Sequence, residues 1–86
     1  MRVKIRLFAR LRELAGAAEL GRDVPAGATV GSVWRLLAAE FPGFDPYERA
    51  IACAVNGDYA RKDYTLQDGD EIAFLPPVSG GEPGRS

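Results

Sequence analysis

The residue types that usually carry out enzymatic chemistry are scarce in this 86-residue sequence, which has no histidine and one cysteine, Cys53. Zinc sites, Ser-His pairs and Cys-His pairs need residues that are missing, and there is no C-x-x-C pair for metal binding or redox chemistry. Cys53 lies in the apolar run AIACAV, which predicts a small core residue and not a reactive thiol. We therefore expect neither a metal site nor catalysis by a side chain.

The segment FLPPVSGG, residues 74–81, combines two prolines with two glycines. Pro76 and Pro77 fix φ, so they are expected to keep the chain extended as it leaves the fold. Gly80 and Gly81 have no Cβ, and a pair of glycines makes the thinnest and most adaptable chain for a narrow passage in another protein. Taken alone, however, two glycines near a terminus usually mark only a flexible end.

The composition is that of one globular domain, with 47% hydrophobic residues, 27% charged residues and a net charge of −1. The charge gives no reason to expect nucleic acid as a partner. No apolar run approaches the roughly 20 residues that span a membrane, and the first residues do not resemble a signal peptide, so we expect a cytoplasmic protein without a membrane partner. The early cations predict one of two things: a solvated strand face whose charge is balanced by acids later in the chain, or a contact surface for an acidic partner. These cations are Arg2, Lys4, Arg6, Arg10 and Arg12, and the acids are Asp58, Asp63, Asp68, Asp70 and Glu71.

Strict alternation of apolar and charged residues over positions 1–7 predicts a half-buried strand. One or two helical turns are expected over 9–16, and a return strand within 18–27, with Leu20 and Val24 pointing inward. The main helix is expected to begin after Thr29 as the N-cap and to end at Pro42, with an apolar stripe that includes Trp34 in the core. A buried strand should lead to a turn at Asn56-Gly57, and a second turn at Asp68-Gly69 should precede the last strand.

One long helix covering one face of a mixed sheet is typical of an α+β fold of the β-grasp kind. We expect this domain over residues 1–79 and a flexible tail over 80–86, because no apolar residue follows Ser79.

Two apolar residues fall on the outward face of the predicted strands by the period of two, namely Phe8 after the first strand and Leu75 in the last. Together with Tyr59, Pro76 and Pro77, they could form a surface that binds partners beside the outgoing chain. The alternative is that they are scattered surface residues without a function.

Three segments in order, LFARLRELAG, AVNG and LQDGDEIAFLPPVSGG, resemble the MoaD family, the small subunits of molybdopterin synthase. The similarity spans residues 1–81, and the family consists of ubiquitin-like sulfur carriers within the MoaD/ThiS superfamily. The resemblance implies that Gly81, with Gly80 beside it, carries the reactive carboxylate. It implies adenylation by a MoeB-like activating enzyme that uses ATP, and then conversion to a thiocarboxylate. A MoaE-like large subunit would use that sulfur to build molybdopterin from cyclic pyranopterin monophosphate. The small subunit itself would bind no cofactor and would not be an enzyme on its own.

The sequence departs from the family pattern after Gly81, where EPGRS follows. A thiocarboxylate cannot form while an amide bond joins Gly81 to Glu82. We expect that a processing protease removes Glu82–Ser86, because an exposed segment with proline and glycine is suitable for cleavage. The alternatives are a fusion with the large subunit that is cut near the junction, and a protein that has lost the chemistry.

Other functions within the same fold stay open from the sequence. Related carriers supply sulfur for thiamin or for tRNA thiolation, or become attached to protein lysines. A β-grasp interaction module without terminal chemistry is the alternative of a different class, and it would bind through a sheet edge or the Phe8 surface.

Overall fold

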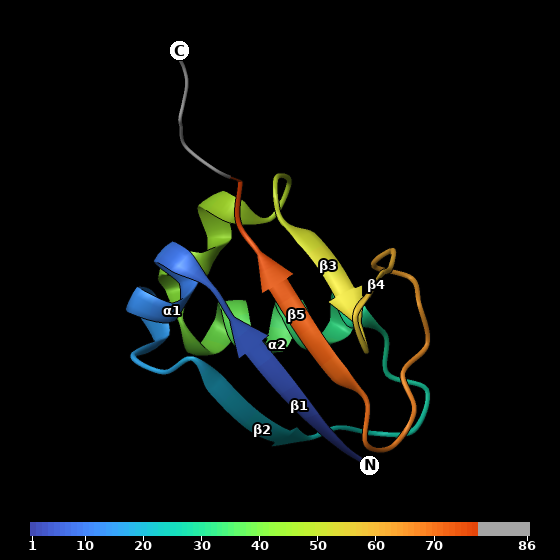
Figure 1. The fold of residues 1–86 in the computed structure, drawn as a ribbon. Helices are drawn as coiled ribbons and strands as arrows, with labels where there is room; N and C mark the ends of the chain where they lie inside the picture. The colour runs from blue at the N-terminus through green and yellow to red at the C-terminus, as the bar shows by residue number, and fades with distance from the viewer. Residues whose placement is uncertain (78–86) are drawn as a thin grey trace.

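The computed structural model describes residues 1–77, which form a five-stranded sheet with one long helix across one face (Figure 1). The strands are β1 (Arg2–Leu7), β2 (Glu19–Asp23), β3 (Ala52–Val55), β4 (Asp58–Tyr59) and β5 (Glu71–Leu75). The helices are α1 (Ala9–Ala15), α2 (Val30–Glu40) and the 3₁₀ helix η1 (Pro42–Tyr47). The predicted α+β, β-grasp class is confirmed, with β4 and η1 as additional elements.

The sheet order is β2-β1-β5-β3-β4, so the first and last strands lie side by side in its centre. They run parallel, with Ile5 opposite Ile72 and Leu7 opposite Phe74, while all other neighbours are antiparallel. The inward residues of β1 are buried in alternation with exposed cations, as the period of two predicts. The last strand is therefore paired on both sides over residues 72–74 and on one side at each end, which fixes the direction in which the chain leaves the sheet.

The core lies between this sheet and α2, and Trp34 is at its centre. Its ring stacks on Phe44 at 5.2 Å between centroids and contacts Phe74 edge-on at the same distance. The predicted stripe is confirmed within α2, because Val30, Val33, Trp34 and Leu37 are all buried; Phe41, the expected end of the stripe, lies just after α2 and is half-buried. Thr29 is the predicted N-cap: its hydroxyl accepts from the Ser32 N–H at 3.1 Å, and the Ser32 hydroxyl in turn accepts from the Thr29 N–H at 2.9 Å.

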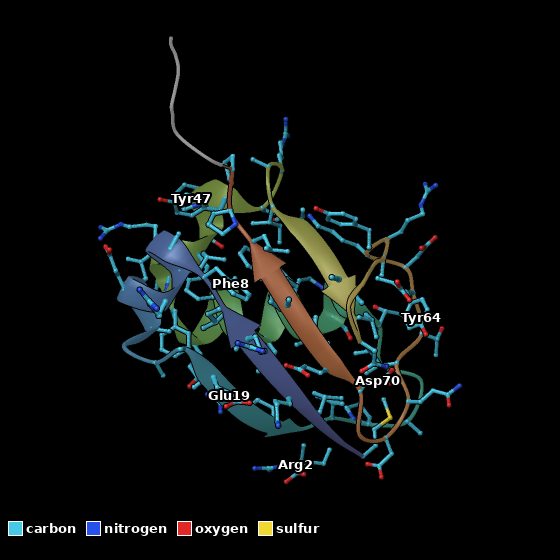
Figure 2. All side chains as sticks on the ribbon, in the orientation of Figure 1. Arg2, Phe8, Glu19, Tyr47, Tyr64 and Asp70 are labelled. Atoms are coloured by element: carbon cyan, nitrogen blue, oxygen red, sulfur yellow. The ribbon has the colours of Figure 1, made fainter. Side chains whose placement is uncertain are left out.

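Two tight turns hold the start of β5, and both were predicted. Asn56 and Gly57 have φ of 52° and 90°, and Gly69 has φ of 86°, all in the left-handed region that these residue types tolerate. The two turns are joined by the buried carboxylate of Asp70, which accepts hydrogen bonds from the Asn56 side chain at 2.9 Å and from the Gln67 N–H at 2.9 Å. Figure 2 shows Asp70 at the end of the sheet where β5 begins. These bonds fix where the final strand enters the sheet.

Candidate functional site

The two glycines expected to carry the chemistry, Gly80 and Gly81, lie outside the described residues, as do Glu82–Ser86 and the boundary expected at residue 79. The site is therefore built from the residues that bring the chain to this point. We call the surface formed by Phe8, Ala52, Leu75, Pro76 and Pro77 the exit surface, because the chain leaves the sheet there.

Strand β5 ends at Leu75, which pairs with Ala52 of β3. Pro76 and Pro77 follow, and neither has an N–H that could continue a ladder. Pro76 is half-buried and Pro77 is exposed. Because Ile72 and Phe74, three residues and one residue before Leu75, are completely buried, the strand is firmly anchored up to the point where the prolines end the ladder.

Phe8 and Leu75 are at the same end of the two central strands. The β1–β5 pairs run from Lys4 opposite Glu71 to Leu7 opposite Phe74, and Phe8 and Leu75 are the residues that directly follow the last pair. Phe8 is 36% exposed and Leu75 is half-buried. The Arg6 guanidinium lies over the Phe8 ring, 5.7 Å from its centroid. The outward orientation expected for both residues from alternation is found, and their role in binding stays a prediction.

Tyr59 lies on the same face of the sheet but at a distance from this pair. It is opposite Ala54, which is opposite Ala73, which is opposite Arg6. Tyr59 is 84% exposed, the most exposed large apolar residue in the described chain. Ala54 and Ala73 lie between Tyr59 and Arg6, and we call this low part of the face the alanine floor; it was not predicted from the sequence. The alternation of Ala52 and Ala54 with buried Cys53 and Val55 could have revealed it.

The cations of β1 are balanced by acids across the strands. Arg2 pairs with Asp23 at 3.2 Å, Lys4 with Glu19 at 3.3 Å, and Arg6 with Glu71 at 3.4 Å. These contacts favour the solvated strand face over a surface for an acidic partner. The expected source of the acids was partly wrong, because two of the three come from β2, the antiparallel neighbour of β1. Asp23 is directly opposite Arg2, and Glu19 reaches Lys4 diagonally from its place opposite Arg6.

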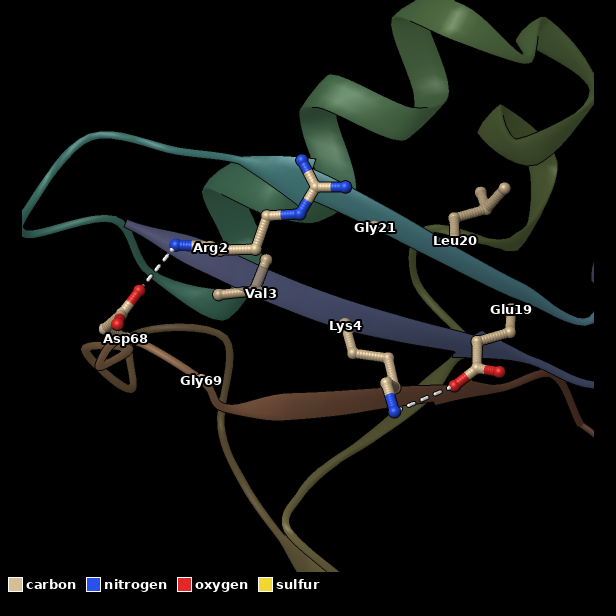
Figure 3. A pocket seen from close by; sticks show the side chains of 8 residues that line it. All are labelled: Arg2, Val3, Lys4, Glu19, Leu20, Gly21, Asp68 and Gly69. Atoms are coloured by element: carbon tan, nitrogen blue, oxygen red, sulfur yellow. Dashed lines mark hydrogen bonds and ion pairs between the residues drawn. The ribbon is translucent and has the colours of Figure 1, made fainter.

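A hollow of about 480 Å³ lies on the outer face between β1 and β2, where Gly21 has no side chain (Figure 3). The Arg2 guanidinium leans over this glycine, and a Cβ there would meet its Nη2 atom at 2.8 Å. Figure 3 shows Lys4 joined to Glu19, and the Arg2 N–H joined to Asp68 at 2.7 Å. These charged groups already have partners within the fold. Because Asp68 and Gly69 come just before β5, the hollow lies at the opposite end of the sheet from the exit surface.

Cys53 is buried in β3, as expected for a core residue. Burial raises the pKa of its thiol, and the nearby Lys62 ammonium opposes that shift only in part. The thiol therefore keeps its proton at neutral pH and is a poor nucleophile. Among residues 1–77, no three His, Cys, Asp or Glu side chains gather as a metal site, and no helix is long and apolar enough to cross a membrane.

Comparison with known proteins gives consistent matches over nearly the whole chain. The ThiS family profile matches residues 5–81. The "Molybdopterin synthase sulfur carrier subunit" of Arabidopsis thaliana is 35% identical over 79 residues, 92% of this chain and 82% of that protein. The protein of the same name from Escherichia coli K12 is 37% identical over 83 residues, 92% of this chain and 99% of that protein.

Two solved structures have the same fold. The crystal structure of SAMP1 from Haloferax volcanii superposes with a TM-score of 0.80 at 33% identity, covering 94% of this chain and 100% of that one. A chain in the "Protein-protein complex of subunit 1 and 2 of Molybdopterin-converting factor" from Helicobacter pylori superposes with a TM-score of 0.66 at 26% identity. It covers 94% of this chain and all of the other. The second of these chains is bound to a partner subunit.

Proposed function

The chain belongs to the ThiS family, and we propose that it works as the sulfur carrier subunit of a molybdopterin synthase. The observation that carries this proposal is the family match over residues 5–81, which ends at Gly81, the second of the two glycines. The reactive group is then the carboxylate of Gly81, with Gly80 beside it. The small subunit supplies sulfur and the large subunit provides the active site.

A free carboxylate is a poor acceptor for sulfur, so it must first be activated. In the proposed reaction, a MoeB-like enzyme joins the Gly81 carboxylate to the AMP part of ATP and releases pyrophosphate. Hydrosulfide from the sulfur source then attacks the carbonyl, the bond to AMP breaks and AMP leaves, and Gly81 carries a thiocarboxylate. The amide bond to Glu82 must be hydrolysed before the first step, since only that hydrolysis produces the carboxylate. A protease acting between Gly81 and Glu82 is therefore part of the proposal.

The exit surface supports this function because it combines a fixed starting point with an apolar contact area. Strand β5 is paired on both sides up to Phe74, and Leu75 is still paired with Ala52, so a partner that docks on Phe8 and Leu75 receives the outgoing chain at a defined position. Pro76 and Pro77 keep that chain from rejoining the ladder. We propose that a MoaE-like large subunit and the activating enzyme both use this surface, one after the other.

The existence of a large-subunit partner is supported by the Helicobacter pylori complex, in which a chain of the same fold is assembled with a second subunit. Tyr59 could extend the contact across the alanine floor, since it is on the same face of the sheet. Its exposed ring would gain buried area only in the presence of a partner.

The similarity to small archaeal modifier protein 1 favours a second candidate function, attachment to other proteins through the same terminal carboxylate. Both functions require activation of Gly81, and they differ in the acceptor. Sulfur transfer leaves the carrier free after each reaction cycle, whereas attachment joins the Gly81 carbonyl to an amine of another protein.

Intact mass spectrometry tests the proposal. A chain ending at Gly81 is incubated with ATP, a sulfur source and the activating enzyme of its own organism, and we expect the mass change of an oxygen-to-sulfur exchange. The full chain and a chain ending at Ser79 are matched controls that should remain unchanged. An unchanged mass for the chain ending at Gly81 would contradict the proposal. A covalent adduct with other proteins, in place of the exchange, would favour the modifier function.

A further inference from the structure

Ala9 has a backbone conformation that its residue type rarely adopts. Its φ is 52°, in the left-handed region, where a Cβ crowds the following carbonyl oxygen. The other described residues with a positive φ are four glycines and Asn56, and both of these types tolerate the region. A strained residue persists only where the surrounding contacts enforce it, and such residues are more frequent at functional sites.

Contacts on both sides of Ala9 enforce this conformation. Leu7 before it and Leu11 after it are both buried. The Leu7 N–H donates to the Ala18 carbonyl at 2.9 Å, and the Leu11 N–H donates to the Phe8 carbonyl at 3.1 Å. Since β1 ends at Leu7 and α1 begins at Ala9, a single residue joins the strand to the helix. The sharp turn that this short junction needs therefore falls on Ala9.

The methyl group of Ala9 is exposed, so its own burial does not explain why alanine holds this position. Glycine would adopt the same φ without strain, but it would also leave the backbone between strand and helix free to adopt other angles. Alanine restricts φ and ψ to a small left-handed region once the neighbouring contacts exclude the others. The direction of the preceding residue, Phe8, is then fixed by the backbone.

The Arg6 guanidinium constrains the side chain of Phe8 as well. It lies over the ring, 5.7 Å from the centroid, and is itself paired with the Glu71 carboxylate at 3.4 Å. The ring is thus held in an exposed position on the outer face of the sheet, where it gains little burial within the chain. A side chain that is ordered before binding loses less conformational entropy when a partner covers it.

We propose that Ala9 is a positioning residue: its left-handed conformation, with the Arg6 guanidinium over the ring, fixes Phe8 in the orientation that partners bind. This role rests on the proposed function, in which Phe8 is part of the exit surface. Ala9 acts on the affinity through Phe8 and not through a contact of its own. A glycine at position 9 should therefore weaken binding even though it relieves strain.

NMR on the isolated full chain tests the orientation without any partner. Three-bond couplings from the backbone to the Phe8 Cγ atom report whether χ1 has one value or an average of several. We expect one value in the original chain and in Ala9→Asn, because Asn56 has the same φ of 52° in this fold. We expect averaged couplings in Ala9→Gly, and also in Arg6→Leu, which removes the guanidinium.

Isothermal titration calorimetry with the purified large subunit of the same organism measures the effect on binding. Ala9→Gly should bind about fivefold more weakly, since one more side chain must be ordered on binding. Ala9→Asn should bind like the original chain. In urea denaturation, the midpoint of Ala9→Gly should be no lower than that of the original chain, because relief of strain offsets the freedom that glycine adds to the unfolded state.

Ala15→Gly is the matched control, because Ala15 is the last residue of the same helix and has no positive φ. It should lower the denaturation midpoint, since glycine is a poor helix former. It should leave the Phe8 couplings and the affinity unchanged. This pattern is the reverse of that expected for Ala9→Gly, so it separates positioning from stability.

Averaged couplings in the original chain would overturn the proposal, because Phe8 would then have no fixed orientation. Unchanged couplings and affinity in Ala9→Gly would overturn it as well, while binding of the original chain would leave the proposed function intact. If the original chain bound no large subunit but its Phe8 couplings still depended on Ala9, the proposed function would be wrong and the positioning of Phe8 would stand.

Discussion

Phe8 is the residue whose environment best distinguishes a binding surface from incidental exposure. Its ring is 36% exposed although the Arg6 guanidinium lies over it, 5.7 Å from the ring centroid. We predict that Phe8→Ala weakens binding to the large subunit about tenfold or more, because aromatic residues near the centre of an interface contribute most of its binding free energy. Isothermal titration calorimetry with the purified large subunit measures this change.

Tyr64→Ala is the matched control for that experiment, because Tyr64 is 44% exposed and lies outside the exit surface. Its affinity should stay close to that of the unmodified chain. Equal losses in both variants would mean that exposed aromatics contribute in a nonspecific way, and the exit surface would lose its assigned role.

Cys53 gives a prediction that depends on pH. Burial raises the pKa of its thiol above the ordinary value, so the folded protein holds a proton that the unfolded chain releases more easily. The contribution of the protonated thiol to the free energy of unfolding is fully present below the unfolded pKa of about 8.5. It is lost as the pH rises through the folded pKa. We expect slow alkylation by iodoacetamide at pH 8 in the folded state and fast alkylation in urea. Equal rates would show that the thiol is accessible.

For single residues, the sequence predicts which face of the sheet a side chain lies on as long as the strand continues. It does not predict the face after a turn. The outward positions of Phe8 and Leu75 follow from the period of two along β1 and β5. The place of Tyr59 cannot be obtained in this way, since Asn56 and Gly57 reverse the chain between β3 and β4. Only the pairing of Tyr59 with Ala54 in the structure shows that Tyr59 lies at a distance from Phe8 on the same face of the sheet.

Among the elements, α2 depends most on its first turn, where Thr29 and Ser32 form reciprocal hydrogen bonds. We predict that Thr29→Ala lowers the free energy of unfolding by about 1 kcal/mol, as for other N-caps. Urea denaturation should show a lower midpoint with an unchanged slope. Because both residues share one capping box, the double variant with Ser32→Ala should lose less than the sum of the single losses. Additive losses would contradict the coupling.

Among the helices, η1 is the one that the sequence did not predict. Pro42 was recognised as the end of α2, but the chain then continues in a 3₁₀ helix with Pro42 at its start and Pro46 inside it. Two prolines and a glycine within six residues carry the pattern of a loop. The helix forms because it buries Phe44 against Trp34, a tertiary contact that local sequence does not contain. In contrast, α2 and the two glycine turns follow from capping, periodicity and positive φ.

At the scale of the whole molecule, the first and last strands of the described chain lie side by side in the middle of the sheet. β1 and β5 are parallel neighbours, and β5 supplies the completely buried Ile72 and Phe74. The final strand therefore belongs to the core, although the residues expected to react follow a few positions later. We therefore expect the stability of the fold to depend on the inward residues of β5 and not on changes after Pro77.

This arrangement predicts that folding and sulfur transfer can be separated by truncation. A chain ending at Pro77 keeps every strand pair, since the last one joins Ala52 to Leu75, and its denaturation midpoint should match that of the full chain. It should no longer accept sulfur, because it lacks Gly81.

A chain ending at Asp70 loses Ile72 and Phe74. The free energy gained by burying these two side chains is comparable to the entire stability of a domain, about 5–15 kcal/mol, so this chain should not fold. Circular dichroism with urea denaturation measures both. A large loss of stability in the chain ending at Pro77 would mean that residues 78–86 contribute to the folded domain, and the separation between fold and reactive end would be wrong.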